Sequence, residues 1–152
     1  MRLKVIARTL FLLCTATIFM SAEAAEKVIW TGDITSDGEP SETITLVNNK
    51  QYQIKVNGFV NLGKWVQNKE ELANDACFEF SPNGKAEKFK SLENSADISV
   101  CNDKYRPDHS YKSEPFIAKQ NRIHFWINDT NYDDNSGALK VQIVELDKTT
   151  AE

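Results

Sequence analysis

The chain has 152 residues, with 18 lysines and arginines against 22 aspartates and glutamates, and a formal net charge of −4 at pH 7. Nucleic acids and anionic membranes repel a chain of this charge, so neither is an expected partner. The length is that of one ordinary domain.

The N-terminal segment has the three parts of a bacterial secretory signal peptide. Basic residues at positions 2, 4 and 8 precede an apolar run from Thr9 to Met20, and Ala22-Glu23-Ala24 follows as a cleavage site. The apolar run is too short to span a membrane comfortably, so no membrane insertion is expected. We predict a signal peptide over residues 1–24 and an exported domain over 25–152, periplasmic or secreted. Removal of three basic residues and one acidic residue moves the net charge from −4 to −6.

The rest of the chain alternates apolar and polar residues with the period of two that is typical of β-strands. Short runs of this kind are separated by turn residues, which favours an all-β fold, a single-domain β-sandwich. The predicted strands are residues 42–47, 52–56, 77–81, 97–101, 122–128 and 138–146. Residues 68–75 are instead typical of a helix of one or two turns.

Two cysteines, Cys77 and Cys101, remain after the signal peptide is removed, because Cys14 lies within it. Two cysteines in an exported chain are expected to pair as a disulfide. Both lie in predicted strands, so we expect the bond to join two strands. A nucleophilic cysteine would need a free thiolate, which an oxidising compartment disfavours.

The predicted strand 122–128 has two different faces. Ile123, Phe125 and Ile127 alternate with His124 and Trp126, so the two aromatic rings should share the face opposite the core. An exposed face of this kind can stack on a sugar ring or anchor a protein partner. An equally good interpretation is that a loop or a second chain covers the face with His124 and Trp126.

Motifs for catalysis are absent from the sequence. The two histidines, His109 and His124, are far apart, and no nucleophile elbow, metal-binding histidine pair or phosphate-binding glycine loop occurs. We therefore do not expect an enzyme.

The strongest local signal is an acidic loop between the last two predicted strands, which we expect to be paired neighbours. Within eight residues it collects Asn128, Asp129, Asn131, Asp133, Asp134 and Asn135. Ca²⁺ prefers six to eight oxygens from carboxylates, amides and backbone carbonyls, and this loop offers all three. A solvated turn whose side chains bind their own backbone explains the same residues equally well.

The C-terminal part of the chain resembles the end of the PA-IL-type soluble lectins. The residues that carry the resemblance are Phe125, Ile127, Asn128, Asp129, Tyr132, Asp134, Asn135, Ser136, Gly137, Val141 and Ile143. Residues 28–34 and 47–65 resemble the first strand and the aromatic-to-glycine loop of the same family. The family implies a galactose-binding-like β-sandwich of jelly-roll type that binds galactose through calcium.

The resemblance also implies a set of calcium ligands. A backbone oxygen before a glycine falls on Leu62, and a second backbone oxygen falls on Asn131 or its neighbour Thr130. The implied side-chain ligands, which also meet the sugar, are Asp129, Asp134 and Asn135. Hydroxyl groups of the sugar would complete the coordination of the ion.

Three departures from the family pattern concern this site. The loop is shorter, Leu62 replaces a tyrosine that contacts the sugar, and residues 67–76 supply Gln67 but no histidine for the family's His–Gln pair. Asp134 replaces an amide and adds a carboxylate, which favours a cation. The departures therefore weaken the prediction of galactose binding more than the prediction of calcium binding.

The sequence thus predicts a periplasmic or secreted domain for calcium-assisted carbohydrate binding, with Ca²⁺ as cofactor and a galactoside-like sugar as partner. The alternative is a protein-binding module, such as an inhibitor of a glycan-degrading enzyme of the lysozyme-inhibitor type, because fold does not fix function. The sequence does not determine the oligomeric state, and a homo-oligomer is one of the alternatives.

Overall fold

The computed structural model describes residues 26–64, 71–81 and 86–147. The predicted signal peptide, residues 1–24, lies outside this part of the chain. Every regular element among the described residues is a strand, which confirms the all-β prediction. No helix there is long and apolar enough to cross a membrane.

The strands follow one another in short steps along the chain. They are β1 (Glu26–Thr35), β2 (Ile44–Thr45), β3 (Gln51–Asn57), β4 (Val60–Lys64), β5 (Glu71–Asn74), β6 (Phe78–Phe80), β7 (Ala86–Lys88), β8 (Leu92–Asn94), β9 (Ser110–Lys112), β10 (Phe116–Ile117), β11 (Arg122–Ile123), β12 (Phe125–Ile127) and β13 (Ser136–Leu146).

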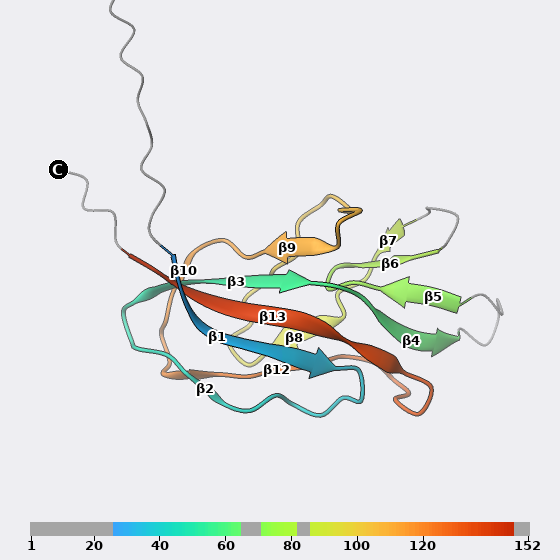
Figure 1. Ribbon diagram of the computed structural model, residues 1–152, viewed down its shortest axis with the longest axis horizontal. Helices are drawn as coiled ribbons and strands as arrows, with labels where there is room; N and C mark the ends of the chain where they lie inside the picture. The colour runs from blue at the N-terminus through green and yellow to red at the C-terminus, as the bar shows by residue number, and fades with distance from the viewer. Residues whose placement is uncertain (1–25, 65–70, 82–85, 148–152) are drawn as a thin grey trace, which may run out of the picture.

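The largest sheet is built around β13, which lies between β1 and β3 and is antiparallel to both (Figure 1). β9 and β10 extend this sheet beyond β3. At its first residues β13 also pairs with β4, and the antiparallel strands β5, β6 and β7 continue from there. One long strand therefore connects two curled groups of antiparallel strands.

A second layer closes the sandwich, formed by the pairs β2–β11 and β8–β12. Trp30 of β1 stacks on Phe125 of β12, with 6.0 Å between the ring centroids, and so joins the layers. The predicted alternation of β3, β12 and β13 is confirmed, because the apolar positions face one shared core. Its fully buried side chains include Ile54, Ile123, Phe125, Ile127, Leu139, Val141 and Ile143.

The helix predicted over residues 68–75 is wrong where the structure describes it, because Glu71–Asn74 form β5. Residues 68–70 lie outside the described residues. β5 pairs with β4 on one side and β6 on the other, so its backbone groups have partners in the sheet. A helix of one or two turns is marginal by itself, and this pairing overrides it.

The strand predicted over residues 97–101 is also absent; the strand lies earlier, at β8. The amide side chain of Asn94 accepts hydrogen bonds from the backbone N–H groups of Ala96 and Ile98 and donates one to the carbonyl of Ile98. A side chain that binds nearby backbone in this way competes with a strand ladder. Asp97, with φ of 54°, completes the turn.

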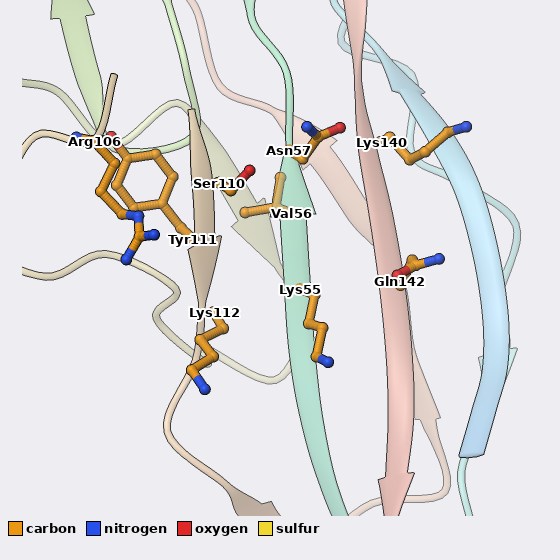
Figure 2. Close-up of a pocket in the computed structure, with 9 residues that line it drawn as sticks. All are labelled: Lys55, Val56, Asn57, Arg106, Ser110, Tyr111, Lys112, Lys140 and Gln142. Carbon is orange, nitrogen blue, oxygen red and sulfur yellow. Dashed lines mark hydrogen bonds between the residues drawn. The ribbon is translucent and has the colours of Figure 1, made fainter. Parts of the chain in front are cut away.

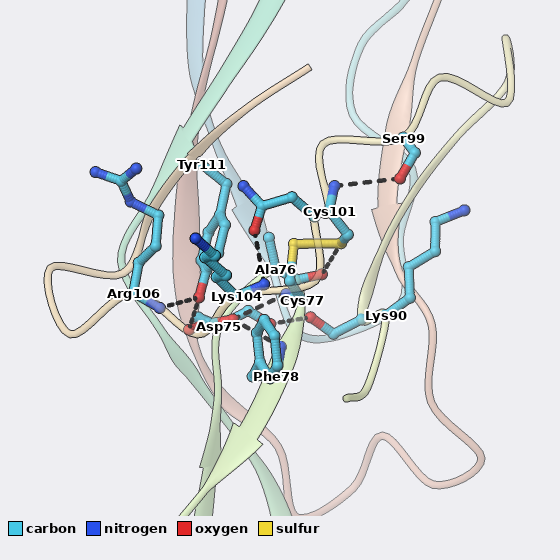
Figure 3. Close-up of a disulfide and its surroundings, with 12 residues drawn as sticks. Asp75, Ala76, Cys77, Phe78, Lys90, Ser99, Cys101, Lys104, Arg106 and Tyr111 are labelled. Atoms are coloured by element: carbon cyan, nitrogen blue, oxygen red, sulfur yellow. Dashed lines mark hydrogen bonds between the residues drawn. A yellow bond between two sulfur atoms is a disulfide. The ribbon is translucent and has the colours of Figure 1, made fainter. Parts of the chain in front are cut away.

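Cys77 and Cys101 form the predicted disulfide, with their Cα atoms 5.2 Å apart. The bond does not join two strands as expected, because Cys77 directly precedes β6 and Cys101 lies in a loop. It anchors that long loop to the core beside Asp75 and Tyr111 (Figure 3).

Reduction of this disulfide is expected to lower the free energy of unfolding by roughly 3 kcal/mol, because the unfolded chain regains the entropy of a closed loop. Urea unfolding with and without reductant measures the loss. The variant C77A/C101A, which has no thiols, should not respond to reductant. An unchanged unfolding midpoint in the reduced wild-type protein would contradict the prediction.

Candidate functional site

The acidic loop of residues 128–135 joins β12 to β13, but these strands are not the paired neighbours that the sequence predicted. β12 pairs with β8 in one layer, whereas β13 pairs with β1, β3 and β4 in the other. The loop therefore crosses between layers at one end of the sandwich. The pairing of Ser136 with Asn61 and of Gly137 with Val60 brings it beside Leu62 and Gly63 of β4.

Gly63 allows the acidic loop to approach the backbone of β4. Its φ is +81°, and a Cβ atom built there would lie 2.1 Å from Oδ2 of Asp134. The carboxylate of Asp134 thus packs directly against the glycine. The two segments that the resemblance paired, Leu62-Gly63 and the acidic loop, are indeed neighbours in space.

Gly63→Ala is expected to destabilise the protein by about 1–3 kcal/mol, because alanine is strained at this positive φ and the added methyl group also displaces the exposed Asp134 carboxylate from Asn131. Gly58→Ala is the matched control. Its φ is +101°, so it carries a similar backbone strain, but its Cβ would meet nothing closer than an oxygen at 3.7 Å. Chemical unfolding of both variants isolates the effect of the clash, and equal losses would contradict it.

A pocket of about 420 Å³ lies between the two segments. The residues that line it are Leu62, Gly63, Asn74, Glu79, Phe89, Asn128, Asp129, Thr130, Asn131 and Asp134. Predicted site residues Leu62, Asp129, Asn131 and Asp134 are therefore brought together around one cavity. Asn135, the remaining predicted ligand, does not line the pocket, and its amide turns instead to the carbonyl of Ser36. Asp133 is exposed and does not line the pocket either.

Hydrogen bonds hold the acidic loop in place. The hydroxyl of Tyr132 accepts from the backbone N–H of Asp129 at 3.1 Å and donates to the carbonyl of Ile127 at 3.4 Å. The amide of Asn135 donates to the carbonyl of Ser36 at 2.9 Å, which ties the end of the loop to the chain after β1. The amide of Asn131 donates to Oδ1 of Asp134 at 2.9 Å.

Two oxygens of this ordered loop are buried without a hydrogen-bond partner: Oδ2 of Asp129 and Oδ1 of Asn135. Buried polar atoms in folded proteins are nearly always paired, so each such atom requires an explanation. Both belong to residues that the sequence predicted as metal ligands. The described residues contain no group of three or more His, Cys, Asp or Glu side chains placed for a metal, and the expected ligand set has only two carboxylates.

The sequence did not predict the other pocket residues, Asn74, Glu79 and Phe89. Asn74 is buried, and its amide nitrogen, a hydrogen-bond donor, has no partner. It lies in the segment that was expected to be helical, so no strand alternation could direct it toward the pocket. Its position depends on the pairing of β5 with β4, which is a long-range property.

A second polar group, also missed by the sequence, lies beneath β9. Oδ2 of the fully buried Asp75 accepts a hydrogen bond from the hydroxyl of Tyr111 at 2.9 Å and lies 3.1 Å from Nδ1 of His109. Burial, with the Asp75 carboxylate beside it, raises the pKa of Tyr111 above its usual value. The ring of His109 stacks on Phe80 at 4.5 Å. His109 is thus anchored in the fold.

The predicted two-faced strand 122–128 is interrupted at His124, where the backbone amide N–H groups bind serine hydroxyls instead of a neighbouring strand. The prediction for its faces is confirmed. His124 and Trp126 are partly exposed on one face, with their rings 5.5 Å apart, and the three apolar neighbours are buried.

Comparison with known protein families, with curated proteins and with solved structures finds no match to this chain.

Proposed function

We propose that the protein is a non-catalytic domain for calcium-assisted carbohydrate binding. The side chains of Asp129, Asp134 and Asn135 would hold the ion, together with backbone oxygens of Leu62 and of Asn131 or Thr130. The observation that carries the proposal is the buried Oδ2 of Asp129, which lines the pocket and has no partner. A cation between the loop and β4 would supply one. Asn135 lies outside the pocket lining and would have to turn its unpartnered Oδ1 toward the ion.

The donor set fits a hard cation. It consists only of oxygens, from carboxylates, one amide and backbone carbonyls, which are the ligands that Ca²⁺ prefers. Zn²⁺ would favour histidine and cysteine, and the cysteines here are tied up in a disulfide. Two carboxylates also give the ion a net electrostatic attraction that offsets the loss of its water.

The rest of the pocket fits an amphipathic polyol such as a sugar. Asn74 offers a buried, unpaired amide donor to a hydroxyl group, and Leu62 and Phe89 offer apolar surface to the carbon face of a ring. Neighbouring hydroxyls of the sugar would complete the coordination of the ion. The resemblance to PA-IL-type lectins supports a galactoside-like ligand, with Asn74 in place of the family's His–Gln pair.

A protein-binding role is the second candidate, and one surface feature favours it. Phe59 is 58% exposed and packs against Phe80 and His109, so it could anchor a protein partner such as a glycan-degrading enzyme. Either role suits an exported protein. The disulfide fits the oxidising periplasm or extracellular space that the predicted signal peptide implies.

A glycan array, probed in calcium and again in EDTA, tests the proposed function. Binding to at least one neutral glycan in calcium, lost in EDTA, is the expected result. Asn74→Ala should weaken that binding while calcium affinity, measured by calorimetry, is unchanged. Binding that is identical in EDTA would refute the calcium-assisted mechanism, and failure to bind any glycan would favour the protein-binding role.

A further inference from the structure

A groove of about 390 Å³ crosses the outer face of the largest sheet, on the side away from the core (Figure 2). Its cations come from different strands and from the loop before β9: Lys55 on β3, Lys112 on β9, Lys140 on β13, and Arg106. Asn57, Ser110 and Gln142 add hydrogen-bonding groups. The groove residues are Lys55, Val56, Asn57, Arg106, Ser110, Tyr111, Lys112, Lys140 and Gln142, and none is acidic.

The strand register concentrates these charges. Lys55 and Lys112 are directly opposed on neighbouring antiparallel strands, a like-charge arrangement that destabilises a sheet. Lys140 is opposed to Asn57, two residues further along β3. Because neighbouring strands lie about 4.8 Å apart, the cations of β9, β3 and β13 extend over roughly 10 Å. The chain as a whole carries a net charge of −4, so this surface is opposite in sign to the protein's overall charge.

Acidic residues at the rim neutralise only part of the groove. Lys55 pairs with Glu26, and Arg106 pairs with Asp108 at 3.2 Å. Both pairs are substantially exposed, so each contributes little and can exchange for another anion. Asp33 on β1 is the cross-strand neighbour of Lys140, but within residues 26–64, 71–81 and 86–147 neither Lys140 nor Lys112 has an ion pair.

We propose that this groove binds an acidic polysaccharide, one that carries carboxylate or sulfate groups along its chain. The cations would meet the anionic groups, and Asn57, Ser110 and Gln142 would bind the hydroxyls between them. Nucleic acid fits less well, because the one aromatic ring among the groove residues, Tyr111, is buried and offers no face on which a base could stack. The groove is separate from the calcium pocket and shares no lining residue with it, so this inference does not depend on the proposed function.

The test measures binding of the mature protein to dextran sulfate and to polygalacturonate, with uncharged dextran as the scaffold control. All measurements contain EDTA, which separates this groove from any calcium-dependent site. Binding to at least one acidic polymer but not to dextran is expected, with the affinity falling steeply as salt rises. Absence of binding to both acidic polymers would overturn the proposal, even if the calcium-dependent function holds.

Charge-reversal variants then locate the site. K112E/K140E should weaken binding about tenfold or more, because two attractions become repulsions. K104E/K119E is the matched control: it makes the same change in net charge at exposed lysines that do not line the groove, and should stay within about twofold. K112R/K140R should keep the affinity. Equal losses in the two Glu variants, or equally tight binding of poly-glutamate or a single-stranded oligonucleotide, would overturn the proposal.

Discussion

Millimolar calcium is expected to raise the thermal midpoint of unfolding, and Asp129→Ala is expected to abolish the rise. An ion that binds only the native state stabilises it by about 2.7 kcal/mol at a hundredfold excess over Kd, and by about 4.1 kcal/mol at a thousandfold excess. The smaller value corresponds to roughly 10 °C for a domain of this size. Asp129 is decisive because its buried oxygen has no other partner.

Asp133→Ala is the matched control, because Asp133 belongs to the same loop but is exposed and outside the pocket. It should keep most of the calcium response. Magnesium should stabilise less, since it requires a tight octahedral shell. Calorimetry on wild-type protein that detects no calcium binding up to about 5 mM, beyond the usual range of extracellular sites, would remove the mechanism and favour the protein-binding role.

The sequence predicted the strands in which the alternation of apolar and polar residues alone fixes which face is buried. Apolar and polar residues alternate throughout β3, and in β13 from Leu139 to Ile143, so one face must turn to the core, and it does. The disulfide was equally predictable, because only two cysteines follow the signal peptide. These features depend on local pattern or on counting, and neither requires knowledge of distant partners.

The sequence failed where partners distant in the chain, or a single side chain, decide the backbone. β5 is a strand because β4 and β6 pair with it on both sides. Residues 97–101 are irregular and not a strand, because a turn precedes them at Ser95 and Ala96 and the side chain of Asn94 binds the backbone of Ala96 and Ile98. The split at His124 has the same kind of cause, since serines at positions 41 and 95 bind the backbone there.

The candidate site was predictable for the acidic loop and, through the family resemblance, for Leu62, but not for Asn74, Glu79 and Phe89. Asp129, Asp134 and Asn135 lie within seven consecutive residues, so their chemistry was visible in the sequence. Asn74 enters the pocket only through strand pairing. The lysines of the basic groove do follow the period of two on their strands, but only the register of β3 with β9 and β13 reveals that they share one surface.

Asp75→Ala is expected to destabilise the protein by about 3–5 kcal/mol, the usual effect of removing one partner from a buried polar network. Asp75 is fully buried, and Oδ1 accepts hydrogen bonds from the backbone N–H groups of Cys77 and Phe78, each at 2.8 Å. Oδ2 accepts a hydrogen bond from the hydroxyl of Tyr111 and lies within hydrogen-bond distance of Nδ1 of His109. Without the carboxylate, these donors would remain buried and unpaired, at the point where the disulfide loop meets the sheet.

Two further variants separate this network from a general effect of losing a carboxylate. Tyr111→Phe removes one donor to Asp75 and should cost less, about 1–1.5 kcal/mol. Asp108→Ala removes a carboxylate that is 57% exposed and should change stability little. Urea unfolding at constant m-value measures all three. A loss below about 1 kcal/mol in Asp75→Ala would mean that water reaches the vacated donors, because only solvation could then offset their lost partner.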